Sequence, residues 1–179
     1  MIHNYIAALP EISLAAGLLV MALVRLFRSE NTPKTFYTLG KFFLAFTLLT
    51  TVVFYNRSWL PQIFENNPYT SLFKIIICLF TLAWAYLSCK WFLNKNYSSW
   101  SFYSLILLEV LLLSLAISAL NFAALFVGLQ GAFLLNWFLI RLGDDEEKKK
   151  RDAARRFLCF ALLFAAFFAC GCVLIFMRA

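Results

Sequence analysis

Charged side chains are scarce in this sequence. Asp, Glu, Lys and Arg together make up 14% of the 179 residues, whereas 63% are hydrophobic and the mean hydropathy is +0.80. A water-soluble domain of this length needs far more polar surface to cover itself. The composition therefore excludes an ordinary soluble domain and indicates a membrane protein.

Residues that carry catalytic or metal chemistry are also few. The single histidine, His3, has no histidine partners for a metal site and is expected to be a solvated N-terminal residue. The cysteines all lie in or at the ends of apolar runs: Cys78, Cys89, Cys159, Cys170 and Cys172. Small residues at a tight helix contact explain the Cys170-Gly171-Cys172 spacing better than a metal or redox pair does. Neither a G-x-G-x-x-G loop, nor a P-loop, nor an H-E-x-x-H motif occurs. We expect no cofactor, no metal and no catalysis from this chain alone.

Long apolar runs dominate what remains. A helix that crosses the ~30 Å hydrocarbon layer needs about 20 mostly apolar residues. Six segments meet this requirement: 5–27, 36–55, 70–93, 101–120, 122–140 and 157–177. They lack period-2 alternation and are rich in Leu, Ala and Phe, which favours helices over a membrane barrel. The sequence predicts an all-α, polytopic membrane protein with a single membrane domain over residues 1–179.

The cations predict the orientation of these spans. Lys and Arg concentrate in the first, third and fifth breaks, namely Arg25, Arg28 and Lys34, then Lys90 and Lys95, then Arg141, Arg155, Arg156 and the run 148–151. Cytoplasmic or matrix-side loops hold the Lys/Arg excess, so the odd loops are expected inside and both termini outside. The net charge of +7 is thus a topology signal and not a nucleic-acid surface. The first run lacks a basic n-region, so we expect a retained span instead of a cleaved signal.

Three polar residues interrupt the fourth and fifth spans. Glu109 lies well inside the fourth, and Gln130 and Asn136 lie on the fifth. Because a tight turn joins these spans, the depths of Glu109 and Gln130 differ by only about 3 Å at ~1.5 Å per residue. We therefore expect Glu109 and Gln130 within hydrogen-bonding range. Two interpretations stay open: a structural interhelical contact worth about 0.6–2 kcal/mol, or a protonatable carboxyl on a proton path.

A charged run precedes the sixth span. In the segment 144–151 each acid stands four residues before a base, a spacing that stabilises a helix by about 0.2–0.5 kcal/mol per pair. A solvated helical extension accounts for the run. Docking onto a neighbouring subunit on the inner side is the alternative.

Several motifs, in order along the chain, carry a family resemblance. These are Leu9-Pro10-Glu11-Ile12, then Ser118-Ala119-Leu120-Asn121-Phe122 followed by Leu125 to Gln130, then Asp152-Ala153-Ala154-Arg155-Arg156-Phe157-Leu158. Together they resemble the N-terminal part of the antiporter-like subunits of respiratory complex I, in particular the subunit N family (subunit 2 in mitochondria). The resemblance spans nearly the whole chain but only about 40% of the family's usual length. It implies a membrane-arm subunit of proton-translocating NADH:ubiquinone oxidoreductase, with other complex I membrane subunits and membrane lipids as partners and no contact with NADH.

Two departures from the family shape the expectation. Gln130 stands where the family carries a glutamate central to proton translocation, and an amide does not exchange a proton at physiological pH. Glu109, at nearly equal depth, is therefore the candidate that would replace it. The family's half-channel lysine, its broken helix and its second repeat all lie beyond the matched segment. We expect a separate chain to supply these helices, with a degenerate remnant kept as scaffold as the alternative.

A partner is also expected on physical grounds. A neighbouring helix would have to satisfy Glu109, Gln130 and Asn136, since lipid cannot, and Asn136 and Arg156 are the interface candidates. Small residues at 15–17, 128–132 and 165–169 would allow its close approach. The 21 phenylalanines favour the mitochondrial inner membrane, with the bacterial plasma membrane as the alternative. An independent small transporter and a membrane assembly or scaffold protein are the rival functions.

Overall fold

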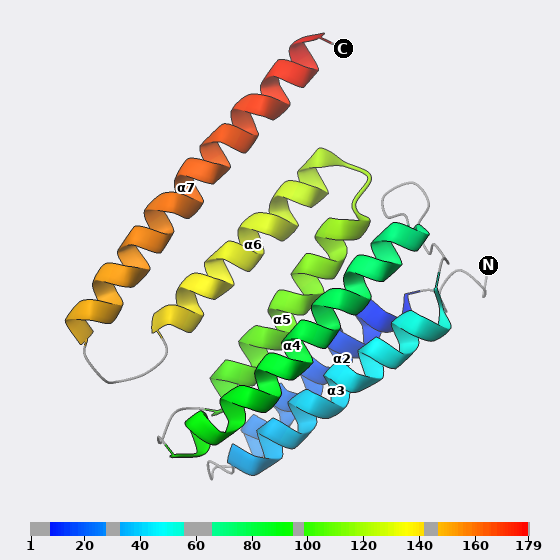
Figure 1. Cartoon of the computed structure of the whole chain (residues 1–179), viewed down its shortest axis with the longest axis vertical. Coiled ribbons are helices and arrows are strands. Elements are labelled where there is room, and N and C mark those ends of the chain that lie inside the picture. Colours follow the sequence, from blue (N-terminus) through cyan, green and yellow to red (C-terminus); the bar gives the residue numbers. More distant parts are fainter. Residues whose placement is uncertain (1–7, 28–32, 56–65, 95–98, 142–146, 179) are drawn as a thin grey trace.

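The computed structural model describes residues 8–27, 33–55, 66–94, 99–141 and 147–178, and this part of the chain is all-helical (Figure 1). The helices are α2 (Leu9–Phe27), α3 (Pro33–Val53), α4 (Pro68–Asn94), α5 (Ser99–Ser118), α6 (Phe122–Arg141) and α7 (Glu147–Arg178). All six are long and apolar enough to cross a membrane. The predicted all-α, multi-pass membrane fold is confirmed, whereas the predicted orientation stays a prediction.

Proline and asparagine mark where the helices begin. Pro33 and Pro68 are the first residues of α3 and α4, a position at which the missing N–H has no intrahelical partner in any case. Asn121 precedes α6 and caps it, because its Oδ1 accepts a hydrogen bond of 3.0 Å from the N–H of Ala123. Helix α7 already begins at Glu147, so residues 147–151 of the charged run are helical as expected. Residues 144–146 of that run and His3 lie outside the described residues.

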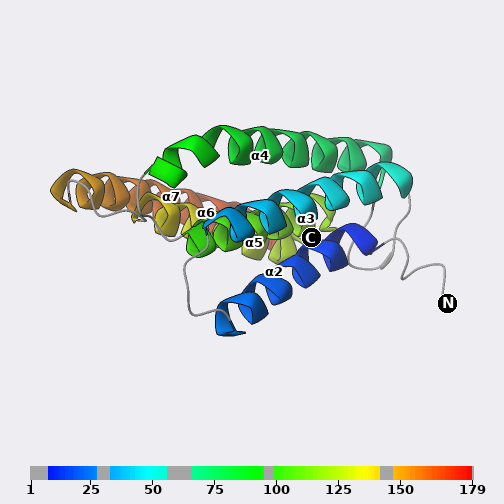
Figure 2. The same cartoon turned by 90° about the horizontal axis from the view of Figure 1, so that it is seen from below.

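Helices α2, α3, α4 and α5 form a bundle with a shared apolar core (Figures 1 and 2). The core is built from side chains of all four helices, among them Leu14, Met21, Phe36, Leu44, Cys78, Ala85, Leu107 and Val110. Gly17 on α2 permits close packing, since a Cβ there would lie 2.7 Å from Cγ of Phe43 on α3. This small-residue position is thus occupied within the chain itself.

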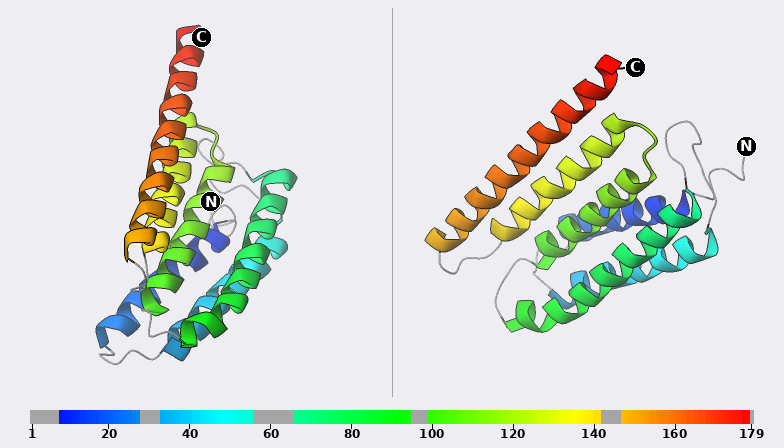
Figure 3. Two further views of the ribbon diagram at one scale, coloured as in Figure 1. Left: turned by 60° about the vertical axis from the view of Figure 1, so that its left-hand side comes forward. Right: turned by 45° about the horizontal axis from the view of Figure 1, so that its top comes forward.

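Helices α6 and α7 extend from one edge of that bundle, and α5, α6 and α7 lie in a row (Figure 3). Gly128 allows α6 to approach α5, because a Cβ at this position would lie 2.7 Å from the Cβ of Ala116. Helix α7 packs chiefly on α6 through phenylalanine rings, such as Phe133 against Phe164 and Phe126 against Phe168. We refer to α6 and α7 together as the wing of the structure.

Candidate functional site

Glu109 and Asn136 form a polar contact between α5 and α6. The Nδ2 of Asn136 donates a hydrogen bond of 2.6 Å to Oε1 of Glu109 and one of 3.1 Å to the carbonyl oxygen of Ala132 on its own helix. Both side chains are half-buried. Two residues predicted to need a polar partner in the membrane thus satisfy each other within this chain.

Gln130 is not the partner of Glu109. The Nε2 of Gln130 is buried and has no hydrogen-bond partner among the described residues. Side chains on a helix lean toward its N-terminus, and α5 and α6 run in opposite directions around their joining turn. The Glu109 side chain therefore leans away from the turn, whereas Gln130 leans toward it. Equal depth of the two Cα atoms therefore does not bring the side chains of Glu109 and Gln130 together. Asn136 lies further from the turn than Gln130, and its side chain leans back toward the turn, within reach of Glu109.

A second polar pair joins α2 to α4. The Nζ of Lys74 lies 2.6 Å from Oε1 of Glu11, and the two side chains are only 3% and 7% exposed. The other carboxylate oxygen of Glu11, Oε2, is buried and has no hydrogen-bond partner among the described residues. This is a buried ion pair inside the predicted membrane layer, with one acceptor left unsatisfied.

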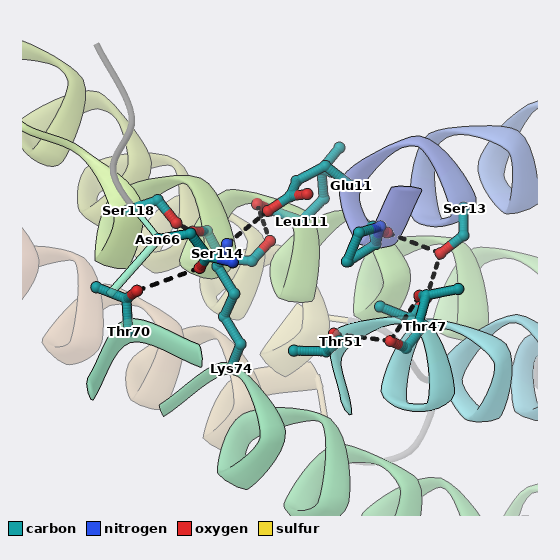
Figure 4. A network of polar contacts seen from close by, with 12 residues as sticks. Glu11, Ser13, Thr47, Thr51, Asn66, Thr70, Lys74, Leu111, Ser114 and Ser118 are labelled. Carbon is teal, nitrogen blue, oxygen red and sulfur yellow. Dashed lines mark hydrogen bonds and ion pairs between the residues drawn. The ribbon is translucent and has the colours of Figure 1, made fainter. Parts of the chain in front are cut away.

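Hydroxyl and amide groups surround the ion pair (Figure 4). On α5, the hydroxyl of Ser114 donates to the carbonyl of Leu111, and that of Ser118 donates to the carbonyl of Ser114. One helical turn before Lys74, the hydroxyl of Thr70 donates to Oδ1 of Asn66 at 3.1 Å. On the other side of α2, the hydroxyls of Ser13 and Thr47 lie 2.7 Å apart. The end of the bundle that holds Glu11 is therefore polar inside.

The ion pair is not apparent from the sequence. Glu11 stands in the Leu-Pro-Glu motif, and nothing near Lys74 in the sequence marks it as the partner. One signal was available: two apolar spans carry residues of opposite charge near their N-terminal ends. These ends lie at the same end of the bundle, because the intervening helix α3 runs in the opposite direction. Because the two residues are 63 positions apart, local patterning does not connect them.

The remaining predicted residue, Arg156, lies exposed on α7, and neighbouring Ala154 is buried. No group of three or more His, Cys, Asp or Glu residues able to hold a metal ion occurs in the described ranges. The arrangement instead holds two carboxyls, those of Glu109 and Glu11, within apolar helices. One of them is bonded to an amide and the other to an ammonium group.

No protein-family model matches the chain. The chain is similar to NADH-quinone oxidoreductase subunit N of Campylobacter lari, with 23% identity over 181 residues that cover 98% of this chain. The resemblance inferred from the motifs is thereby confirmed. This chain spans 37% of the length of that relative.

Proposed function

We propose that this chain is a membrane subunit of an NADH-quinone oxidoreductase and takes the place of the N-terminal third of subunit N. The observation that carries the proposal is a similarity extending over 98% of the chain, together with six helices able to span a membrane. In this role the chain contributes to the structure of a proton half-channel and does not itself bind NADH. Its compartment would be the mitochondrial inner membrane, with the bacterial plasma membrane as the alternative.

The wing supports the further proposal that additional helices lie against α6 and α7. Only 6% of the α7 span is buried, and Phe160 and Phe167 are 74% and 70% exposed. An apolar groove of about 350 Å³ lies beside these rings and is lined by residues of both helices. In this proposal a separate chain, equivalent to a later part of subunit N, supplies the helices that cover this face.

Glu109 is the candidate proton carrier at the α5–α6 contact. It is the ionisable member of that contact, whereas its partner Asn136 is an amide, which neither gains nor loses a proton near neutral pH. Replacement of Glu109 by Gln keeps an acceptor oxygen for Asn136 and removes the titratable group. We expect Glu109→Gln to lower the number of protons moved per NADH oxidised in the assembled complex. Unchanged pumping would leave Glu109 with a structural role alone.

Native gel electrophoresis of mildly solubilised membranes tests the proposed assembly. We expect this chain to migrate in a high-mass band that oxidises NADH, and mass spectrometry of the band to identify a chain supplying the remaining subunit N helices. A small band that lacks respiratory subunits would contradict the proposal and favour an independent membrane protein.

A further inference from the structure

The Glu11–Lys74 pair is costly to keep in a membrane protein. Removing two charges from water carries a penalty of several kcal/mol per ion, which attraction offsets only when every remaining donor and acceptor is satisfied. Here Oε2 of Glu11 has no partner in the part of the chain that the structure describes. Ionisable side chains at such positions usually face a protein interior or a water-filled path, and they mark ion or proton pathways.

Polar side chains lead to the pair from one end of the bundle. On the α4 side, Asn66, Thr70 and Lys74 follow one another at intervals of four residues and so share one face. On α5, Ser118 and Ser114 do the same from the opposite chain direction (Figure 4). All five are buried or half-buried, so the polar groups lie inside the protein and not on its surface.

Beyond the pair, the interior is apolar. The next buried side chains toward the opposite end of the bundle are those of Leu14 on α2, Leu44 on α3, Cys78 on α4 and Val110 on α5. The polar side chains therefore end at the level of Glu11. A group at the inner end of such a polar stretch exchanges protons with the aqueous phase at one end of the bundle only.

We propose that Glu11 and Lys74 form a proton-exchange site, reached by water along these polar side chains from the end where α2 and α4 begin and α5 ends. The carboxylate of Glu11 takes a proton from a hydronium ion onto its free Oε2, leaving a water molecule. The resulting carboxylic acid carries no charge to oppose the ammonium of Lys74, so the ion pair weakens. Release of the proton to water restores the pair.

At the polar end of the bundle, the exposed Tyr55, just past α3, donates its hydroxyl to the carbonyl of Pro68. Other titratable groups on the packed helices lie further along or on other faces. The buried thiol of Cys78 lies four residues after Lys74 and so one turn further along the same face of α4. On α3, Lys41 contacts the rings of Tyr37 and Tyr86 toward the opposite end of the bundle. On α5, Tyr103 packs with Tyr37 at that same end, and Glu109 bonds to α6. Proton exchange is therefore centred on Glu11.

This site is separate from the α5–α6 contact. Glu109 and Ser114 are five residues apart on α5 and project about 140° apart around the helix axis. A contribution of Glu11 to proton pumping rests on the proposed function, whereas proton exchange at Glu11 is a property of the chain itself. If native gels show this chain outside any high-mass band that oxidises NADH, the contribution of Glu11 to pumping is overturned. Proton exchange at Glu11 is not affected by that result.

Infrared difference spectroscopy of the full chain in lipid nanodiscs tests the proposal. We expect a carboxylic acid C=O band that appears as the pH falls and is lost in Glu11→Gln. The band should also shift promptly in D₂O. Glu109→Gln is the matched control, because it removes the carboxyl of α5 and should leave the Glu11 band in place. Absence of a titrating Glu11 band, or a band that resists exchange in D₂O, would overturn the proposal.

Cys78 provides a second readout that leaves the ion pair intact. In a variant that retains Cys78 as the only cysteine, its S–H stretching band reports the charge on Glu11 and Lys74. We expect this band to shift over the same pH range as the Glu11 carboxyl band. A Cys78 band that stays constant over that range would show that the ion pair never changes its charge, and it would overturn the proposal even where Glu11→Gln fails to fold.

Discussion

The bundle and the wing differ in burial far more than in hydrophobicity. The α5 span has a mean hydropathy of 2.0 and is 44% buried, whereas the α7 span has the highest value, 2.7, and is 6% buried. In water the more apolar helix would be the more buried one. In lipid, apolar surface gives no drive for helices to associate, so close packing and polar contacts decide which helices meet. The comparison shows that hydropathy determines which segments enter the membrane, and small or polar residues determine which of them pack together.

The two polar pairs repeat this contrast. Glu11 and Lys74 are enclosed by the bundle, whereas Glu109 and Asn136 are half-buried where the bundle meets the wing. A pair that is fully enclosed depends on this chain alone. The exposed side of the wing, by contrast, leaves room for a partner to change the environment of the second pair.

Breaking the enclosed ion pair should have the largest effect on stability. We expect Lys74→Met to destabilise the chain by about 3–5 kcal/mol, because it leaves the buried carboxylate of Glu11 uncompensated. The loss of stability is measured by adding increasing amounts of a denaturing detergent to the chain in mild detergent and following its unfolding by circular dichroism. The double variant Glu11→Leu/Lys74→Met is the control and should recover most of the stability. A single variant as stable as the parent would mean that the pair is not buried.

The close approach of α5 and α6 should be next in sensitivity. A Cβ at Gly128 would lie 2.7 Å from the Cβ of Ala116 and 2.9 Å from the carbonyl oxygen of Leu112. We therefore expect Gly128→Val to cost about 1–3 kcal/mol through overpacking. Gly171→Val on α7 is the matched control, because nothing lies within 4 Å of a Cβ there. Equal stabilities of the two variants would argue against the α5–α6 packing.

The half-buried polar pair should contribute less. Asn136→Leu removes the hydrogen bond to Glu109, and we expect a loss of about 0.6–2 kcal/mol. Gln130→Leu, on the same helix, removes an amide whose buried Nε2 has no partner among the described residues, so it should be neutral or stabilising. The same unfolding measurement separates the two variants. The reverse order of stabilities would indicate that Gln130, and not Asn136, bonds to Glu109.

The exposed side of α7 should matter least to the chain itself. We expect Gly171→Val to change its stability by no more than about 0.5 kcal/mol. In native membranes, however, the same variant should reduce the share of the chain found in the high-mass complex, because a partner helix on α7 would meet the added side chain. Native gels of membranes that contain the parent chain and of membranes that contain the variant compare the two shares. Full assembly of the variant would mean that no helix packs against α7 at this position.

The sequence alone determined the all-α, multi-pass membrane class, and it predicts where the spans lie and that Glu109 is a membrane carboxyl. These follow from local properties, since about 20 apolar residues span a bilayer whatever surrounds them, and Pro33, Pro68 and Asn121 act within one helical turn. The membrane class and the helix starts need only neighbouring residues. The resemblance to subunit N rests instead on the order of short motifs along the chain, and the similarity to the Campylobacter lari protein confirms it.

Only the tertiary structure decided which polar groups meet. The choice of Asn136 over Gln130 as the partner of Glu109 depends on the rotation of two helices and on the lean of their side chains. The Glu11–Lys74 pair depends on α2 and α4 lying in one bundle, although the two residues are 63 positions apart. Such pairings are set by packing between distant segments, and the period and composition of each segment do not contain them.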